Sequence, residues 1–165
     1  MVFDENTQDS RLLQTAMGSG TIHQPTTIIC EEEFSLAESS RIDSYCLINA
    51  EGGARIQDVS VIHAGSHVVG TGSVEMGPRS VITYNCVVLT APADLAYPAS
   101  SVVPKDQLGS ITADVKLERE TFVGSGSVVM PGVTVAEGGA IAANTYVDED
   151  VPPWSIRYPD GSTGE

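Results

Sequence analysis

An aliphatic residue returns every six positions in the segment 123–147, at Val123, Val129, Val135, Ile141 and Val147. Four positions after each of the first four stands a small or β-branched residue, and Gly, Asn or Pro falls between them. Neither a helix, with its period of 3.6, nor an alternating strand, with its period of 2, gives this spacing. A fixed short period is typical of a parallel β-helix built from hexapeptide repeats, each a short strand followed by a turn. The pattern therefore predicts an all-β solenoid.

The same six-residue phase extends over most of the chain. Two steps of eight residues interrupt it, one after Ile48 and one after Val68, and both contain glycine, which tolerates the backbone of a bulging corner. The two steps lie one coil plus two residues apart, so we expect them to stack on one edge of the solenoid. The phase predicts inward-pointing side chains at Cys30, Leu36, Ile42, Ile48, Ile56, Ile62, Val68, Met76, Ile82, Val88, Ile111, Leu117 and the five positions of 123–147.

Segments outside the phase define the predicted domain organisation. Residues 1–29 are expected to form an N-terminal cap segment, with a short helix after Asp9 or Ser10 that covers the open end of the solenoid. Residues 90–110 are too long for a corner and predict a projecting loop, and loops of this length are usually functional or disordered. Pro152 and Pro153 end the repeat. The prediction is a β-helix domain over 30–156, followed by a C-terminal tail over 157–165.

The charge balance is strongly acidic. Eight Lys and Arg stand against 22 Asp and Glu, a formal net charge of −14. Binding of nucleic acid is not expected, because phosphate recognition needs clustered cations. The excess fits a solvated acidic surface, and the scarcity of lysine favours a halophilic origin, where salt screens like charges.

The cysteines and the hydropathy give an expected location. Cys30, Cys46 and Cys86 are odd in number and lack metal-ligand spacing. They are interpreted as reduced packing residues. The sequence has no recognisable signal peptide and no apolar run of membrane-spanning length. We therefore expect a cytoplasmic protein without membrane insertion.

Two blocks of sequence resemble a known family. Val-Gly-Ser-Gly-Ser-Val-Val-Met-Pro-Gly-Val-Thr-Val-Ala-Glu-Gly at 123–138 and Val-Pro-Pro-Trp-Ser-Ile at 151–156 are similar to the last coils and exit turn of the hexapeptide-repeat acyltransferases. The projecting segment 90–110 and Arg-Ile-Asp-Ser-Tyr-Cys-Leu-Ile at 41–48 resemble the sugar O-acetyltransferases of this family. The resemblance implies a left-handed β-helix that assembles as a homotrimer and moves an acetyl group from acetyl-CoA to a hydroxyl or amine of a sugar or glycan precursor. It implies no metal.

The resemblance also implies a general base, normally a His at the root of the projecting loop. This chain has Ala93 where that His is expected. Acyl transfer still requires a group that takes the proton of the acceptor. The hypothesis is therefore that His63 or His67 is the base, facing a neighbouring subunit, and that Asp94 orients the imidazole or binds a sugar hydroxyl.

Further candidates follow from position along the coils. Tyr84 and Asn85 should face outward just before the projecting loop, where Asn85 could bind acceptor hydroxyls or the oxyanion. Alternatively, Asn85 occupies a corner turn in left-handed geometry. Arg157 is a hypothetical partner of the coenzyme A phosphates. The resemblance places the pantetheine arm along small residues that the repeat also needs for packing: Gly124, Ser125, Gly126, Ala142 and Ala143.

Two other functions stay open. A non-catalytic solenoid, either a scaffold or a degenerate paralogue, is favoured by the absent loop His. A zinc carbonic anhydrase of the β-helix type needs three His ligands. His63 and His67 could supply two of them, and His23 is poorly placed for the third.

Overall fold

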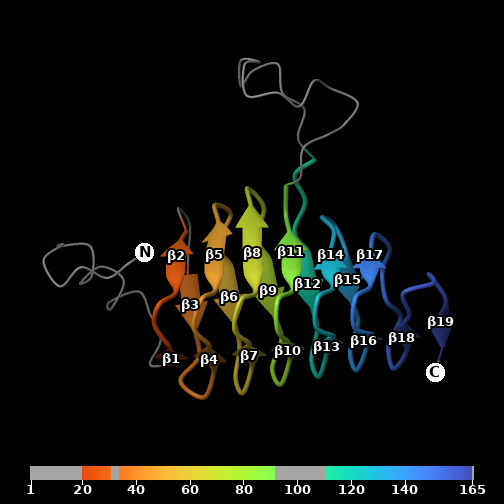
Figure 1. Ribbon diagram of the computed structural model, residues 1–165, viewed down its shortest axis with the longest axis horizontal. Helices are drawn as coiled ribbons and strands as arrows, with labels where there is room; N and C mark the ends of the chain where they lie inside the picture. Colours follow the sequence, from red (N-terminus) through yellow and green to blue (C-terminus); the bar gives the residue numbers. More distant parts are fainter. Residues whose placement is uncertain (1–19, 31–33, 92–110, 165) are drawn as a thin grey trace, which may run out of the picture.

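The computed structural model describes residues 20–30, 34–91 and 111–164. These residues form a parallel β-solenoid of about six turns, and no helix occurs among them (Figure 1). The solenoid is three-sided, with one parallel sheet on each side. The prediction of an all-β hexapeptide-repeat β-helix is confirmed. The helix expected after Asp9 or Ser10 lies outside the described residues.

The first five coils each contribute one short strand to each of three sheets. Sheet A contains β1 (Thr21–Ile22), β4 (Arg41–Ile42), β7 (Val61–Ile62), β10 (Val81–Ile82), β13 (Phe122–Val123), β16 (Ala140–Ile141), β18 (Ile156–Arg157) and β19 (Thr163–Gly164). Sheet B contains β2 (Thr27–Ile29), β5 (Leu47–Ala50), β8 (His67–Gly70), β11 (Val87–Leu89), β14 (Val128–Val129) and β17 (Tyr146–Val147). Sheet C contains β3 (Phe34–Leu36), β6 (Ala54–Ile56), β9 (Val74–Met76), β12 (Val115–Leu117) and β15 (Thr134–Val135).

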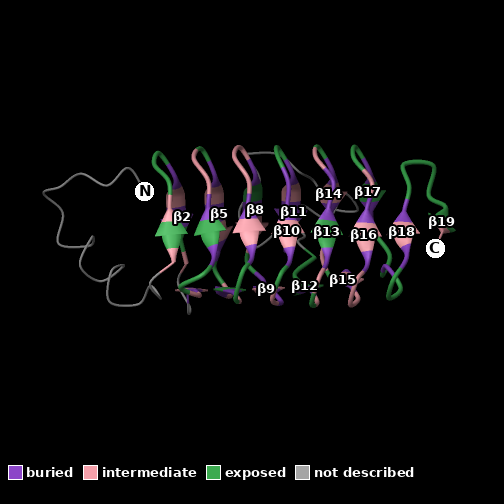
Figure 2. Cartoon of the chain, turned by 90° about the horizontal axis from the view of Figure 1, so that it is seen from below, coloured by how far each residue is buried: buried purple, intermediate pink, exposed green. Residues whose placement is uncertain are grey.

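The coils wind in a left-handed sense. In Figure 1 the chain advances from left to right, and β5, β8 and β11 of sheet B rise in the foreground. Sheet C descends behind them, and the view from below in Figure 2 separates the two sheets in the same way. A helix is left-handed when its chain rises in front, descends behind and advances to the right. The handedness that the family resemblance implied is therefore present.

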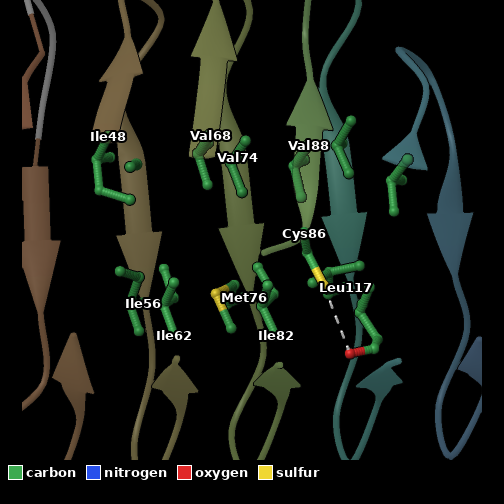
Figure 3. Close-up of a cluster of buried hydrophobic side chains, with 14 of the residues drawn as sticks. Ile48, Ile56, Ile62, Val68, Val74, Met76, Ile82, Cys86, Val88 and Leu117 are labelled. Atoms are coloured by element: carbon green, nitrogen blue, oxygen red, sulfur yellow. Dashed lines mark hydrogen bonds between the residues drawn. The ribbon is translucent and has the colours of Figure 1, made fainter. Parts of the chain in front are cut away.

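The aliphatic positions form columns inside the solenoid. Ile42 pairs with Ile62, Ile62 with Ile82, and Ile82 with Val123, so residues on successive coils stand above one another. Figure 3 shows such side chains filling the interior from all three sheets. Figure 2 shows that buried residues recur along every coil, between intermediate and exposed ones. Burial of these side chains is the main favourable term in folding.

The eight-residue steps stack as expected, and the structure adds a third. β5 is paired with β8 through Ala50 and Gly70, at the corner where the extra residues are accommodated. The earlier coil has the same step, because Ile28 pairs with Ile48 and is 2% exposed. The inward residue of this coil is therefore Ile28, and the prediction of Cys30 was wrong. Cys30 is half-buried against the core, and burial raises the pKa of its thiol.

The limits of the repeat also differ from the prediction. β1 and β2 already pair with β4 and β5, so the solenoid begins before residue 30. Ile111 is 53% exposed, and the chain re-enters the interior at Val115. At the other end, β18 continues sheet A and β19 pairs with it in antiparallel fashion. The segment 157–164 therefore closes the last coil rather than forming a separate tail.

Serine hydroxyls tie the corners of successive coils together. The Ser60 hydroxyl donates to the Gly77 carbonyl at 2.9 Å and accepts from the Ser80 amide at 3.2 Å. Ser40 makes the equivalent pair of contacts with Gln57 and Ser60. Only a small hydroxyl side chain fits this buried place and satisfies both backbone groups. Cys46 and Cys86 are buried at corresponding corners as free thiols.

Candidate active site

A polar cluster lies at the corner between sheets A and B. The position directly after the inward Ile of each sheet A strand carries Asp43, His63 and Thr83 on three successive coils. The His63 amide donates to the Ile82 carbonyl at 2.8 Å, and the Asp43 amide donates to the Ile62 carbonyl at 2.8 Å. Because the register fixes these residues one coil apart, about 5 Å, their side chains are direct neighbours.

His63 is held on two sides. Its Nδ1 lies 2.9 Å from Oδ2 of Asp43, and Arg41 Nε donates to Oδ1 of the same carboxylate at 2.8 Å. On the following coil the Tyr84 ring stacks on the imidazole, with centroids 4.6 Å apart and planes inclined by 27°. The side chains of His63 and Asp43 are each 21% exposed. The imidazole is therefore fixed in place yet reachable from solvent.

The arrangement defines what His63 can do chemically. A carboxylate at Nδ1 favours a proton on that nitrogen, because the carboxylate can only accept. The other ring nitrogen, Nε2, then carries the lone pair and can take a proton from a bound molecule. Among the described residues, the structure gives Nε2 no hydrogen-bond partner. The cluster is a candidate general base.

The predicted pantetheine surface lies on the same corner. Gly124 and Ala142 continue the column of His63 on later coils, and Gly124 is two coils from His63, about 10 Å. The Ser125 hydroxyl donates to the Thr83 hydroxyl at 3.0 Å, which links this surface to the coil of Tyr84. The structure thus brings His63 and the five small residues onto one edge of the solenoid: Gly124, Ser125, Gly126, Ala142 and Ala143.

The chain resembles characterised acyltransferases in sequence. It is 28% identical over 129 residues to dTDP-4-amino-4,6-dideoxy-D-glucose acyltransferase of Escherichia coli, a match that covers 76% of this chain and 67% of that protein. A second match, to a putative acetyltransferase of Schizosaccharomyces pombe, is 38% identical over 39 residues and covers 24% and 19% of the two chains. No protein-family profile matches the chain.

Solved structures give the same picture of the fold. AntD, an N-acyltransferase from Bacillus cereus, was solved with dTDP and 3-hydroxybutyryl-CoA. It superposes with a TM-score of 0.80 at 23% identity, over 92% of this chain and 84% of that one. The hexapeptide-repeat acetyltransferase VCA0836 from Vibrio cholerae, with acetyl coenzyme A, superposes with a TM-score of 0.56 at 18% identity, over 94% and 73%.

In sequence and in fold the chain is thus similar to the hexapeptide-repeat β-helix acyltransferases, in agreement with the family resemblance found in the sequence. The narrower resemblance, to sugar O-acetyltransferases, is not supported, because the E. coli protein acts on an amino sugar and AntD is an N-acyltransferase.

Of the other predicted catalytic residues, the structure describes only His67, which lies outside the cluster. His67 begins β8 on the outer face of sheet B, between Leu47 and Val87, and is exposed. The structure records no hydrogen bond between His67 and His63 among the described residues. Asp94 lies outside the described residues. Of the predicted catalytic residues that the structure describes, only His63 has a bonded carboxylate.

The predicted acceptor residues Tyr84 and Asn85 have different surroundings. Tyr84 contacts His63, as described above, and is 50% exposed. Asn85 has φ of 55° and stands over Gly65, where an added Cβ would lie 2.3 Å from Asn85 Oδ1. This is the corner turn in left-handed geometry that was the alternative interpretation of Asn85. Its binding of an acceptor stays a prediction.

Arg157 has the contacts of a capping residue. It pairs with Ile141 in register, at the inward position of the last sheet A strand, and is 8% exposed. Its Nη1 donates to the Gly161 carbonyl at 2.6 Å, and its Nη2 donates to Glu149 at 2.8 Å. A guanidinium held in this way fills the end of the solenoid, so its geometry gives the phosphate hypothesis no support.

Sequence reasoning missed Arg41 and Asp43. The signal was available, because Asp43 stands twenty residues before His63, which is the length of one coil that contains an eight-residue step. Among the described residues, no three His, Cys, Asp or Glu side chains are arranged to hold a metal ion. In this part of the chain, no helix is long and apolar enough to cross a membrane.

Proposed function

We propose that this protein is an acyl-CoA-dependent N-acyltransferase whose acceptor is the amine of a nucleotide-linked amino sugar. The E. coli relative acts on dTDP-4-amino-4,6-dideoxy-D-glucose, and AntD binds coenzyme A together with the same amino sugar nucleotide. The single observation that carries the proposal in this chain is the His63–Asp43 pair, beside a row of small residues on one corner.

The pair suits the proton transfer that amide formation needs. The sugar amine attacks the thioester carbonyl, so that a C–N bond forms while the C–S bond breaks. The nitrogen must lose one proton, and Nε2 of His63 accepts it. Asp43 stabilises the imidazolium that results. The coenzyme A thiolate leaves and takes up a proton, which restores the charge balance of the reaction.

We further propose that the active form is a homotrimer in which a second subunit covers the His63 corner. The outward residues of sheet B are mainly apolar, whereas sheet C presents Arg55, Glu75, Lys116 and Glu118. An apolar sheet face of this kind is typical of a protein interface. The outward apolar residues along sheet B include Ile29, Leu47, Val69, Val87, Leu89, Val128 and Met130.

The position of Thr90, at the start of the loop predicted over 90–110, also supports a shared site. Thr90 lies six residues beyond Tyr84, at the other end of sheet B, which is a separation of about 20 Å. Thr90 and His63 of one subunit are therefore far apart, and we propose that a neighbouring subunit completes the site. The free thiols of the described coils fit a reducing compartment, and we propose a cytoplasmic location.

The test is an acyl-transfer assay with defined substrates. The protein is incubated with acetyl-CoA or 3-hydroxybutyryl-CoA and dTDP-4-amino-4,6-dideoxyglucose. Release of the coenzyme A thiol is measured with a colorimetric thiol assay. The acylated sugar nucleotide is detected by mass spectrometry. dTDP-glucose serves as the hydroxyl-only control and should give no product. Acylation of dTDP-glucose in place of the amino sugar would contradict the N-acyltransferase assignment.

His63→Ala is expected to lower kcat by about 100-fold, the usual size of a general-base contribution. His67→Ala is the matched control, because it removes an exposed imidazole from the adjacent strand β8. Equal loss in both variants would contradict the role of His63. Absence of coenzyme A binding in a thermal-shift assay of the unaltered protein would favour a non-catalytic solenoid, because a bound ligand must stabilise the fold.

A further inference from the structure

We propose that Arg41 and Tyr84 are positioning residues that lock the imidazole of His63 into one tautomer and one orientation, an inference that rests on the proposed function of His63 as proton acceptor. Neither side chain needs to touch the substrate for this role. Both are fixed by the stacking of coils, Arg41 on β4 before His63 and Tyr84 on the coil after it.

Arg41 acts through Asp43. The two oxygens of the Asp43 carboxylate are divided, with Oδ1 bound by Arg41 Nε at 2.8 Å and Oδ2 facing His63 Nδ1 at 2.9 Å. A carboxylate on a short side chain can otherwise rotate and expose either oxygen to water. Because Arg41 occupies one oxygen, the second is left aimed at the ring. Arg41 is exposed by 44%, so its main effect is on geometry rather than on stability.

The tautomer decides whether His63 can accept a proton. A histidine without a partner in water prefers its proton on Nε2, which would place a donor where the acceptor amine arrives. The bond from Nδ1–H to Asp43 reverses this preference and leaves the lone pair on Nε2. The Arg41–Asp43 contact thus determines the tautomer of a residue that Arg41 itself does not bond.

Tyr84 prevents the ring from turning over. A rotation of 180° about the bond to the imidazole would exchange Nδ1 for a carbon, and the Asp43 contact would be lost. The Tyr84 ring covers one face of the imidazole at a centroid distance of 4.6 Å, with the planes inclined by 27°. Such a stacked pair resists rotation through its contact area and needs only the aromatic ring, not the hydroxyl.

The positions of these residues distinguish this corner from the others. Arg79 and Glu120 make an exposed ion pair on another corner, between sheets C and A, with no histidine beside it. Tyr158 is an exposed tyrosine on the final coil, beyond β18. These residues provide matched control variants, because Arg79→Met and Tyr158→Leu remove the same side chains from places without an imidazole.

The experiment reads the tautomer directly. Long-range 1H–15N NMR spectra of the full-length protein report which ring nitrogen of His63 carries the proton, with the signal assigned by its absence in His63→Gln. The unaltered protein should show the proton on Nδ1. Arg41→Met and Tyr84→Leu should move it to Nε2 and lower kcat by about tenfold at unchanged KM for coenzyme A. Tyr84→Phe should retain the tautomer, because the aromatic ring that stacks on the imidazole remains.

The outcomes separate the two proposals. If Nδ1 stays protonated in Arg41→Met and in Tyr84→Leu, the positioning role is wrong, even if His63→Gln is inactive. If the tautomer changes as expected but His63→Gln retains full turnover, the proton-acceptor role of His63 is wrong. The positioning of its ring by Arg41 and Tyr84 is then still supported. If Arg79→Met and Tyr158→Leu lower kcat equally, the effect is a general loss of structure, and the positioning role is overturned.

Discussion

The same corner of the solenoid differs between its earlier and its later coils. Directly after the inward aliphatic residue, the early coils carry Asp43 and His63, whereas the later coils carry Gly124 and Ala142. The backbone is alike in both, because every strand pairs in the same register. The hexapeptide repeat therefore fixes which residues point inward. It leaves the outward position that follows free to hold either a reactive side chain or a small residue.

The later coils carry only small residues at this position for a physical reason. An added Cβ at Gly124 would lie 2.5 Å from the Ala143 amide nitrogen and 2.6 Å from the Ile141 carbonyl oxygen. Backbone atoms at those distances cannot move aside without disturbing the next coil. In the early coils the side chains leave the corner along the surface and contact one another instead. The comparison therefore divides this edge of the solenoid into a reactive section, around Asp43 and His63, and a smooth section, around Gly124 and Ala142.

The largest expected effect comes from adding a side chain to the smooth section. Gly124→Ala should lower the free energy of unfolding by about 3 kcal/mol, because the methyl group meets backbone on the next coil. Denaturant unfolding measures this. The control is Gly132→Ala, where only Ala113 Cβ lies within 4 Å, at 3.6 Å, but φ is +84°. The control should lose about 1 kcal/mol, and equal losses would show that packing at Gly124 is not the cause.

The second effect concerns the buried hydroxyls that join the early coils. Ser60→Ala removes the donor to Gly77 and the acceptor of the Ser80 amide, and both backbone groups stay buried. The free energy of unfolding should fall by about 2 kcal/mol. Ser35→Ala, on the outer face of sheet C, should change it by less than about 0.5 kcal/mol. A Ser60→Ala protein as stable as the parent would mean that water replaces the hydroxyl.

The third effect tests the end of the smooth section. Arg157→Met replaces a buried guanidinium by an apolar side chain of similar length at an inward position. Its stability should be unchanged or higher by about 1 kcal/mol, because the charge no longer has to be desolvated. Affinity for coenzyme A, measured by calorimetry, should not change. A tenfold weaker affinity would instead restore the hypothesis that Arg157 meets the cofactor phosphates.

The smallest effect concerns Asp114, just after the described chain resumes at residue 111. The Ser73 amide donates to Asp114 at 2.8 Å and, with the Ser73 hydroxyl, lowers the pKa of the Asp114 carboxyl. A lowered pKa in the folded state gives stability that is present above the ordinary value of about 3.9 and is lost as the pH falls through the folded value. Asp114→Asn should remove this part of the acid dependence of stability. Thermal unfolding measured between about pH 5 and about pH 3 checks this.

Much of the fold could be predicted because the hexapeptide period is local. An inward side chain every six residues has no other stable solution than a stack of short parallel strands, and Ile42, Ile62 and Ile82 stand where the period places them. The phase failed at Cys30 and Ile111. Both lie next to segments where the number of residues per coil changes. A fixed period of six residues does not predict where such a change falls.

The candidate site could be predicted only in part. His63 was found because a titratable residue in an outward place is visible in one repeat. Its partners were not found, because Arg41, Asp43 and Tyr84 come from the coils on either side and meet His63 only once the register is known. The surroundings of Arg157 could not be predicted for the converse reason, since no local pattern says that a charged residue turns inward.

The sequence by itself determined that the interior is a column of aliphatic side chains, because burial of apolar surface at a fixed period depends only on which residues recur. The tertiary structure alone decided which outward residues become neighbours. Side chains about twenty residues apart come within hydrogen-bonding distance only after each coil closes and the next is laid upon it. The reactive corner is therefore a property of stacking, whereas the core is a property of the repeat.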